Sequence, residues 1–469
     1  MNLPHFAQLA RPAPRALSGA RALVLGLGAT GFSAAKWLTR EHARPIVADT
    51  RRSPPQAAQL AAALPDVPLR AGPFEPSLLD GVDLLCISPG LPLAQPLITQ
   101  AIARGIPVVG DIELFAWHVR ARSSCRVLAV TGTNGKTTVT ALTGHLLRTA
   151  GIDCEVAGNI GPAALDALAL RLDAGKMPEV WVLELSSYQL ETAWALEPDA
   201  ATMLNLSEDH LDRYAGLAEY GAAKARIFIG DGLQVLNRDD ARSMAMSLPG
   251  RRRMSFGLDV PSEDEDLGAR VVGTTRWLAQ GRTPILDAAE LNIHGEHNLA
   301  NALAAAALAR AVGVSHAAIA AGLKSFAGLP HRVEHVAVYR GVDYFDDSKG
   351  TNVGATIAAL QGLRRQIVLI AGGDGKGQDF APLADPVARY ARRVLLIGRD
   401  APLIGRALAG CAVPVERLGS LEEAVRRAAD CACEGDAVLL SPACASFDMF
   451  RDYKHRGDVF AAAARGLGG

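Results

Sequence analysis

The amino-acid sequence predicts an α/β protein of about three domains, and three observations lead to this expectation. Its 469 residues exceed what a single core accommodates, since domains usually hold roughly 100–200 residues. Short apolar runs alternate with Ala- and Leu-rich helical stretches along almost the whole chain. Two polar segments interrupt this alternation at positions that suit domain boundaries.

The polar segments divide the chain as follows. Residues 120–124 precede a new apolar run, and residues 328–332 separate a long helical stretch from the run that follows. Chains usually pass between domains in exposed polar connections that few contacts cross. The expected domains are therefore residues 1–122, 123–328 and 329–469.

Apolar runs of about four residues are expected to form the strands. Strands buried on both faces of a parallel sheet read as continuous apolar runs rather than alternating ones. A strand-then-helix order favours helices on both faces of such a sheet. The expected strands include residues 22–25, 45–48, 127–130, 180–183, 201–204, 367–370, 394–397 and 437–440.

The composition is that of an ordinary globular protein. Apolar residues make up 49% of the chain and charged residues 21%, which leaves ample apolar surface to bury. The formal net charge is −1, whereas nucleic-acid-binding proteins usually carry a basic surplus, so we expect no nucleic-acid partner. The acidic stretch at residues 263–266 is expected to be an exposed loop.

The cysteine spacing and the lengths of the apolar runs indicate the cellular compartment in which the protein works. The seven cysteines have no paired spacing, so we expect reduced thiols and neither disulfides nor a zinc site. The apolar run at residues 22–25 is too short for a signal peptide and breaks at Gly26. No apolar stretch approaches the ~20 residues that a membrane helix needs. We expect a cytoplasmic monomer without membrane insertion.

A glycine-rich turn follows the first expected strand. Residues 26–31 read Gly-Leu-Gly-Ala-Thr-Gly and open a helix, and Asp49 ends the next strand. This pattern matches the dinucleotide fingerprint, in which glycines admit a diphosphate and an acid contacts ribose. A helix N-terminus binds a diphosphate whatever is attached to it, so a UDP-sugar suits the turn as well as NAD does. A tight turn without a ligand is the third alternative.

A phosphate-binding loop is the strongest local signal. Residues 131–138 read Thr-Gly-Thr-Asn-Gly-Lys-Thr-Thr between an apolar run and a helix. Backbone N–H groups cradle phosphates in such a loop, while Lys136 adds charge and Thr137 offers a hydroxyl to Mg²⁺. Val130 replaces the first glycine of the standard pattern, so this loop is a shorter variant. Glu184 ends the strand at 180–183 and could hold the ATP metal, although a strand-end Glu alone is usually solvated.

A lysine lies on the apolar face of an expected helix around residues 219–228. Tyr220, Lys224 and Phe228 recur at helical spacing. Such a lysine often extends to water, but if it is desolvated its pKa falls and the neutral amine can react with CO₂ to form a carbamate. A carbamate would be an anionic oxygen ligand for a metal. His210 lies in a loop nearby, where an isolated histidine is more often a surface residue than a ligand.

Nine short motifs are spread along nearly the whole chain. They are residues 132–137 (GTNGKT), 158–161 (GNIG), 184–187 (ELSS), 208–210 (EDH), 297–301 (HNLAN), 329–332 (LPHR), 347–352 (DSKGTN), 372–376 (GGDGK) and 441–448 (SPACASFD). Together they resemble the Mur ligase family of peptidoglycan synthesis. The last three narrow the resemblance to the members that add D-glutamate to UDP-N-acetylmuramoyl-L-alanine.

The resemblance implies a fold and a reaction. The fold would comprise a Rossmann-like N-terminal domain for the UDP-substrate, a central P-loop ATPase-like domain with a parallel sheet, and a Rossmann-like C-terminal domain for the amino acid. The reaction would be an ATP-dependent ligation through an acyl phosphate, with Mg²⁺ at two sites. The glycine-rich turn would then hold UDP rather than NAD.

The resemblance also implies roles for individual residues. Catalytic roles fall to Lys136, Glu184, His210 and a carbamylated Lys224. Metal contacts fall to Thr137, Glu184, His210 and Lys224. ATP contacts fall to Gly132, Thr133, Asn134, Gly135, Lys136, Thr137, Thr138, Asn298, Asn301, Arg332 and Asp347. UDP-substrate contacts fall to Thr30, Asp49, Thr50, Arg51, Ser88, Gly90, Asn159 and Ser186. Glutamate contacts fall to Lys349, Thr351, Lys376, Ser446, Phe447 and Tyr453.

Three other functions remain open on the residues alone. An NAD oxidoreductase would use the glycine-rich turn but leave Lys136 and Glu184 without a role. A plain P-loop ATPase or kinase would hydrolyse ATP without needing both co-substrates. A folylpolyglutamate-type ligase would share the central domain but lack the N-terminal turn and the signature at residues 347–352.

Overall fold

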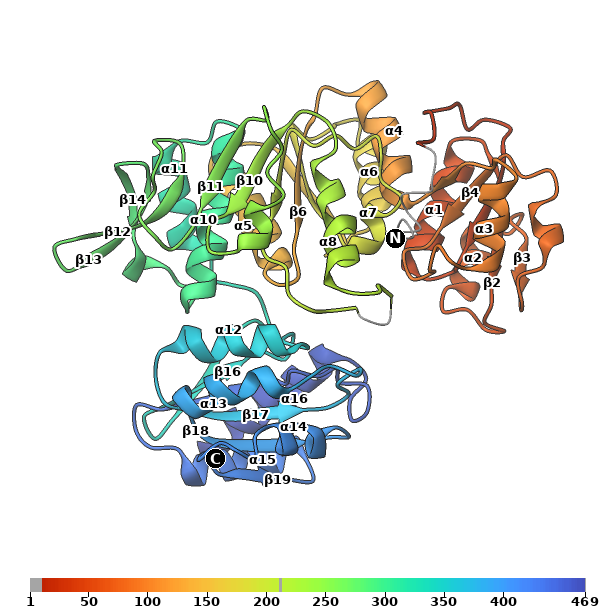
Figure 1. Cartoon of the computed structure of the whole chain (residues 1–469). Helices are drawn as coiled ribbons and strands as arrows, with labels where there is room; N and C mark the ends of the chain where they lie inside the picture. The colour runs from red at the N-terminus through yellow and green to blue at the C-terminus, as the bar shows by residue number, and fades with distance from the viewer. Residues whose placement is uncertain (1–10, 211–212, 469) are drawn as a thin grey trace.

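The structure, a computed structural model, describes residues 11–210 and 213–468. These residues form three β-sheets, each covered by helices (Figure 1). The N-terminal and central parts lie in one row, and the C-terminal part lies beneath the central one (Figure 1). Within the described ranges, no helix is both long and apolar enough to cross a membrane.

The N-terminal sheet has five parallel strands in the order β3-β2-β1-β4-β5. After β1 the chain adds β2 and then β3 along one edge of β1. It then crosses over and adds β4 and β5 along the other edge of β1. Such a reversal leaves a crevice at the carboxyl end of β1, where ligands bind in open α/β sheets. The elements are β1 (Arg21–Leu25), α1 (Ala29–Arg40), β2 (Arg44–Asp49), α2 (Ala57–Ala63), β3 (Leu69–Ala71), η2 (Pro76–Leu79), β4 (Leu84–Ile87), α3 (Pro96–Ala103), β5 (Val108–Val109) and α4 (Asp111–Arg122).

The central sheet has nine strands in the order β14-β13-β12-β11-β10-β9-β6-β8-β7. Strands β6 to β11 run parallel, whereas β12, β13 and β14 form an antiparallel meander. The elements are β6 (Arg126–Thr131), α5 (Lys136–Thr149), β7 (Cys154–Gly158), α6 (Ala164–Asp173), β8 (Val180–Glu184), α7 (Ser187–Leu190), β9 (Ala200–Met203), α8 (Leu217–Ala225), η3 (Arg226–Phe228), β10 (Leu233–Asn237), α9 (Ala241–Met244), β11 (Arg253–Phe256), β12 (Leu267–Val272), β13 (Thr275–Gln280), β14 (Thr283–Asp287), η4 (Ala288–Glu290), α10 (Glu296–Ala311) and α11 (His316–Ser325).

The C-terminal sheet has six strands in the order β15-β16-β20-β17-β18-β19. Only β15 runs antiparallel to its neighbour. The elements are β15 (Glu334–Tyr339), β16 (Val342–Asp346), α12 (Val353–Leu363), β17 (Ile367–Gly372), η5 (Ala381–Leu383), α13 (Ala384–Tyr390), β18 (Ala391–Ile397), α14 (Ala401–Ala407), β19 (Val415–Arg417), α15 (Leu421–Cys431), β20 (Ala437–Leu440), α16 (Tyr453–Arg465) and η6 (Gly466–Gly468).

Apolar packing joins the N-terminal part to the central part. One continuous cluster of buried residues runs from the N-terminal sheet into the central sheet, and α4 packs against both α1 and α6. Ion pairs reinforce the contact between α1 and α6, with Lys36 2.8 Å from Asp166 and Arg40 2.7 Å from Asp173. The C-terminal sheet instead has apolar clusters of its own. It is therefore the part least tied to the others by apolar packing.

Two expectations need correction. The central sheet is not wholly parallel, because the meander β12–β14 extends it; these strands carry polar and exposed residues and gave no continuous apolar run. The acidic stretch at 263–266 is exposed only in part. Asp266 is buried, because its Oδ1 accepts a hydrogen bond from the backbone N–H of Ser255 at 2.6 Å.

Candidate active site

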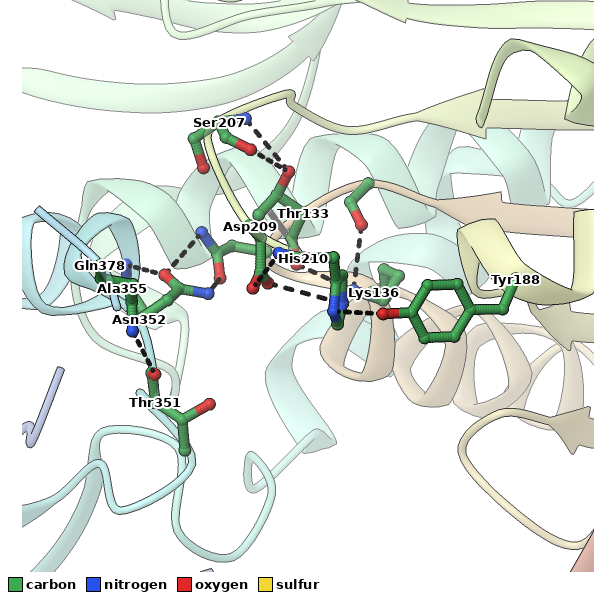
Figure 2. A network of polar contacts seen from close by, with 12 residues as sticks. Thr133, Lys136, Tyr188, Ser207, Asp209, His210, Thr351, Asn352, Ala355 and Gln378 are labelled. Carbon is green, nitrogen blue, oxygen red and sulfur yellow. Dashed lines mark hydrogen bonds and ion pairs between the residues drawn. The ribbon is translucent and has the colours of Figure 1, made fainter. Parts of the chain in front are cut away.

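The phosphate loop joins β6 to α5, and its own lysine side chain donates hydrogen bonds to its backbone carbonyl groups. Its backbone needs glycine at Gly132 and Gly135, whose φ angles are +152° and +84°. Lys136 Nζ donates to the carbonyl oxygens of Gly132 at 3.0 Å and Thr133 at 2.8 Å (Figure 2). Desolvation lowers the pKa of Lys136. The lysine thus caps carbonyl groups in a loop whose N–H groups suit a phosphate.

Glu184 lies beside this loop at the end of β8. Its Oε1 accepts a hydrogen bond from Asn159 Nδ2 at 2.7 Å, while Oε2 is buried and has no partner among the described residues. A buried carboxylate oxygen without a partner is costly unless a ligand satisfies it. Thr137 Oγ1 accepts a hydrogen bond from Arg332 at 2.6 Å. A free carboxylate oxygen and a loop hydroxyl are donors that suit Mg²⁺, so these residues fit the expected metal.

Lys224 is buried on α8 with 1% of its surface exposed. Its Nζ donates to the carbonyl oxygen of Gly132 at 2.8 Å, so two lysine side chains share that oxygen. Burial, and then the nearby Lys136, lower the pKa of Lys224 well below its usual value. Of the two alternatives that the sequence left open for this lysine, the structure shows the buried one, and burial shifts the amine toward its neutral form.

His210 lies in the loop after β9, close to the same site. Its Nδ1 is 2.7 Å from the hydroxyl of Tyr188, and its Nε2 is 3.8 Å from Asp209 (Figure 2). Tyr220 lies near both His210 and Lys224: the rings of His210 and Tyr220 are 5.9 Å apart, and Lys224 Nζ is 4.6 Å from the centre of the Tyr220 ring. His210 and Lys224 therefore share Tyr220 as a neighbour.

A cavity of about 460 Å³ lies between the central and C-terminal parts. Asn298 and Asn301 face it from α10, with Asn301 donating to Asn298 Oδ1 at 3.1 Å. Arg332 and Asp347 line it from the C-terminal side. Burial raises the pKa of Asp347 to about 7, which leaves this carboxyl poised between its two forms near neutral pH. Of the residues expected to contact ATP, Asn134, Gly135, Thr138, Asn298, Asn301, Arg332 and Asp347 line this cavity.

A second cavity, of about 580 Å³, opens at the carboxyl end of β1. Asp49 fixes the glycine-rich turn there, because Oδ2 accepts a hydrogen bond from the N–H of Leu27 at 2.7 Å and the carboxylate pairs with Arg51. The Arg51 hydrogen bond lowers the pKa of Asp49 to about 2. The structure brings together the whole expected UDP-substrate set, since the lining includes Thr30, Asp49, Thr50, Arg51, Ser88, Gly90, Asn159 and Ser186.

The residues expected around glutamate are not gathered at one place in this arrangement. Lys349 Nζ lies 3.8 Å from the ring centre of Tyr453. Burial lowers the pKa of Lys349 to about 8. Lys376 instead lines a third cavity, of about 510 Å³, together with Asp209 and His210. The remaining members differ in exposure: Thr351 is half-buried, Ser446 is buried, and Phe447 is 72% exposed.

Sequence reasoning missed several contributors. Asn352 of the C-terminal part exchanges hydrogen bonds with Asn134 of the phosphate loop, at 3.1 and 3.4 Å (Figure 2). Asn205 Oδ1 accepts a hydrogen bond from the N–H of Asn134 at 2.8 Å. Asn352 belonged to a quoted motif, but its spacing from the loop gave no signal. Asp111 and Gln189 line the cavity at the carboxyl end of β1 from different elements and were not singled out at all.

Comparisons with known proteins agree along the chain. Family models match as follows: the Mur ligase MurD-like N-terminal domain at residues 20–110, the Mur ligase middle domain at 130–309, and the Mur ligase glutamate ligase domain at 331–444. UDP-N-acetylmuramoylalanine–D-glutamate ligase of Nitrosospira multiformis is 55% identical over 96% of each chain. The enzyme of the same name from Aromatoleum aromaticum is 53% identical over 96% of this chain and 98% of its own.

Solved structures share the fold at lower identity. Crystal structure I of MurF from Acinetobacter baumannii aligns with a TM-score of 0.60 at 18% identity, over 97% of this chain and 93% of its own. UDP-N-acetylmuramate–alanine ligase MurC from Thermotoga maritima aligns with a TM-score of 0.58 at 18% identity, over 95% and 99%. At such identities the likeness concerns the arrangement of the sheets and helices alone.

Proposed function

This chain belongs to the Mur ligase family, and from that premise we propose that it is the ATP-dependent ligase that joins D-glutamate to UDP-N-acetylmuramoyl-L-alanine. The relatives with more than half of their residues identical carry that activity in their names. The observation that carries the proposal is the loop lysine Lys136 beside Glu184, whose Oε2 is buried without a partner. This pair suits the transfer of a phosphoryl group to another acid.

The chemistry requires activation of a carboxylate. A carboxylate is a poor electrophile, so one oxygen of the alanyl carboxylate attacks the γ-phosphorus of ATP and ADP leaves. The glutamate amine then attacks the carbonyl carbon of the acyl phosphate and loses a proton, and inorganic phosphate leaves with that carboxylate oxygen. Positioning and neutralisation of phosphate charge supply most of the catalysis in such a transfer. Lys136 would hold the γ-phosphate, since its ammonium is the nearest cation in the loop.

Magnesium is part of the proposal, with two sites. Glu184 and Thr137 would hold one ion, and His210 with a carbamylated Lys224 would hold the other. Bound Mg²⁺ would neutralise charge on the β- and γ-phosphates. Arg332, which donates to the Thr137 hydroxyl, would turn from it to the phosphates when the nucleotide binds. Arg332 would thereby couple nucleotide binding to the position of the C-terminal part.

Each of the three parts would bind one of the three substrates. Residues 1–122 would hold the UDP-substrate, 123–328 ATP, and 329–469 the amino acid. Lys349 and Lys376 would bind the two glutamate carboxylates, since two cations suit a dicarboxylate. Thr351, Ser446, Phe447 and Tyr453 would complete that site. We place the enzyme in the cytoplasm as a monomer.

A coupled assay tests the proposal. Purified protein receives ATP, Mg²⁺ and UDP-N-acetylmuramoyl-L-alanine together with either D- or L-glutamate, and phosphate release is followed. We expect release with D-glutamate and little with L-glutamate. Lys136→Ala should reduce the rate by about 100-fold or more, because it removes a charge that acts on the transferring group. ATP hydrolysis that ignores both co-substrates would contradict the proposal.

A further inference from the structure

The floor of the UDP cavity contains a buried carboxyl group that the proposed chemistry does not use. Asp111 is the first residue of α4, has 1% of its surface exposed, and lines the cavity together with Ser186 and Gln189. It comes from the N-terminal side of the chain, whereas Gln189 belongs to α7 of the central part. The carboxyl therefore lies where the two parts meet beneath the substrate site.

A chain of hydrogen bonds leads from this carboxyl to the cavity wall. Asp111 Oδ2 accepts from Gln189 Nε2 at 3.0 Å. Gln189 Oε1 in turn accepts from the N–H of Ser186 at 3.2 Å and from its hydroxyl at 3.3 Å. The bond from the N–H of Ser186, together with the one that Ser186 Oγ accepts from the N–H of Gln189 at 3.2 Å, forms the capping box of α7. Because Asp111 accepts a hydrogen bond from the side-chain amide N–H of Gln189, it holds this amide in one orientation. The amide oxygen is then directed at Ser186, which lies in the cavity wall.

The surroundings favour the neutral form of Asp111. Its Oδ1 has no hydrogen-bond partner in the part of the chain that the structure describes. Burial without a cationic partner shifts a carboxyl group toward its protonated form. Burial raises the pKa of Asp111 to about 6, although the hydrogen bond from Gln189 lowers it.

The groups on the neighbouring elements leave this conclusion unchanged. None of them forms an ion pair with Asp111 within the described ranges. The titratable or charged groups concerned are Lys36 and Arg40 on α1, Cys86 on β4, Asp166, Arg171 and Asp173 on α6, Tyr188 on α7, Glu113, His118, Arg120 and Arg122 on α4, and Asp49 and Arg51 across the cavity.

We propose that Asp111 is a positioning residue that works in its protonated form, holding Gln189 and Ser186 against the muramoyl end of the substrate. The inference rests on the proposed function, because that function places a UDP-linked substrate in this cavity. A diphosphate brings two negative charges into the cavity, and like charges raise the pKa of a nearby acid. Substrate binding therefore takes up a proton at Asp111.

The sign of the pH dependence follows from this linkage. Below the pKa of Asp111 in the free protein, the acid is already neutral and affinity does not depend on it. Above that pKa, about 6, binding must first protonate the group, so the Kd of the substrate rises by up to about tenfold per pH unit. The rise ends at the higher pKa of the bound state. ATP binding, in the other cavity, does not share this dependence.

Calorimetry of the full chain near pH 7 tests the proposal. UDP-N-acetylmuramoyl-L-alanine is titrated in two buffers of different ionisation enthalpy, and the difference in heat gives the protons taken up. For the native protein we expect uptake of up to about 0.9 proton per substrate, the fraction of Asp111 ionised one unit above its pKa. Asp111→Asn keeps an oxygen that can accept from Gln189 but cannot titrate. This variant should take up fewer protons when it binds the substrate. Its Kd should not show the rise with pH that the ionisation of Asp111 causes in the native protein.

Controls separate this inference from the proposed function. Asp80→Asn changes an exposed carboxylate that pairs with Arg104, and it should behave as the native protein does. Asp111→Ala should raise the KM for the UDP-substrate about tenfold with kcat and the KM for ATP little changed, because it frees the Gln189 amide. Equal proton uptake in native and Asp111→Asn proteins would overturn the inference alone. A native protein that does not bind the UDP-substrate would instead overturn the proposed function.

Discussion

Two lysine side chains, Lys224 buried and Lys136 half-buried, share one carbonyl oxygen beside the phosphate loop. Lys136 and Lys224 both donate to the oxygen of Gly132, and both have lowered pKa values. Two ammonium groups so close in a desolvated site repel each other, so the one with the deeper burial loses its proton first. That one is Lys224, and a neutral amine facing a phosphate loop is poised to react with CO₂.

We predict that Lys224→Ala lowers the rate of phosphate release by about 100-fold, because the variant would lose the proposed carbamate ligand of the second metal ion. Added acetate or formate should restore part of the activity of this variant, since a small carboxylate can replace the carbamate. Lys224→Arg is the matched control, because it keeps the charge but cannot be carbamylated, and short carboxylates should not rescue it. Rescue of both variants, or of neither, would contradict the carbamate.

The sequence predicted these residues unevenly. Helical spacing placed Lys224 on the apolar face of its helix but left open whether its amine reaches water, and only the structure shows that it is buried. The metal-binding role predicted for Glu184 rests on its place at a strand end beside the loop, and it stays a prediction. Asp111 could not be found in this way, because its partner Gln189 is 78 residues away and only the packing of α4 brings them together. Long-range polar contacts of this kind have no periodic signal in the sequence.

At the scale of elements, the strands that were predicted are those buried on both faces. Each expected run lies within a strand or extends one residue past it, because burial of both faces leaves a continuous apolar run. The meander β12–β14 escaped prediction because it is partly exposed, with Val271 at 68% and Val272 at 61%. Edge strands of that kind mix polar and apolar residues and resemble loops.

The first turn of α1 gives a prediction at the same scale. A Cβ added at Gly31 would lie 1.8 Å from the carbonyl oxygen of Gly26, a contact with rigid backbone. Gly31→Ala should therefore lower the free energy of unfolding of the N-terminal part by about 2–3 kcal/mol. Gly28→Ala is the control, because a Cβ there meets nothing within 4 Å. Equal thermal midpoints for the two variants would refute this account of the turn.

At the scale of the whole molecule, the three parts are joined in two different ways. The N-terminal and central parts share a continuous apolar core. The C-terminal part meets the phosphate loop chiefly through polar contacts, Arg332 with Thr137 and Asn352 with Asn134. Polar contacts exchange partners at lower cost than an apolar core does, so the C-terminal part is the one expected to move.

Fluorescence energy transfer can measure this motion. With one label on the C-terminal part and one on the central part, we expect the distance to shorten when ATP, Mg²⁺ and the UDP-substrate are added together. A second pair, on the N-terminal and central parts, should change far less because the shared core resists movement. Larger changes in the second pair than in the first would contradict this assignment of rigid and mobile contacts.

The domain order was predicted from the sequence, but the relative placement of the parts was not. The alternatives of an NAD oxidoreductase, a plain ATPase and a folylpolyglutamate-type ligase are set aside by the match of Mur ligase family models to all three parts of the chain. That Lys349 and Lys376 line different cavities could not be foreseen, because both cavities form where loops of the C-terminal part pack against the central part, and such packing leaves no periodic signal in the sequence.

Transfer of an oxygen atom tests the central claim most directly. The alanyl carboxylate of the UDP-substrate is labelled with ¹⁸O, and the phosphate released with ATP and D-glutamate is analysed by mass spectrometry. An acyl phosphate keeps the attacking carboxylate oxygen bonded to phosphorus, so each released phosphate should contain one ¹⁸O atom. Phosphate without label, formed while the amide product accumulates, would contradict the proposed activation of the carboxylate.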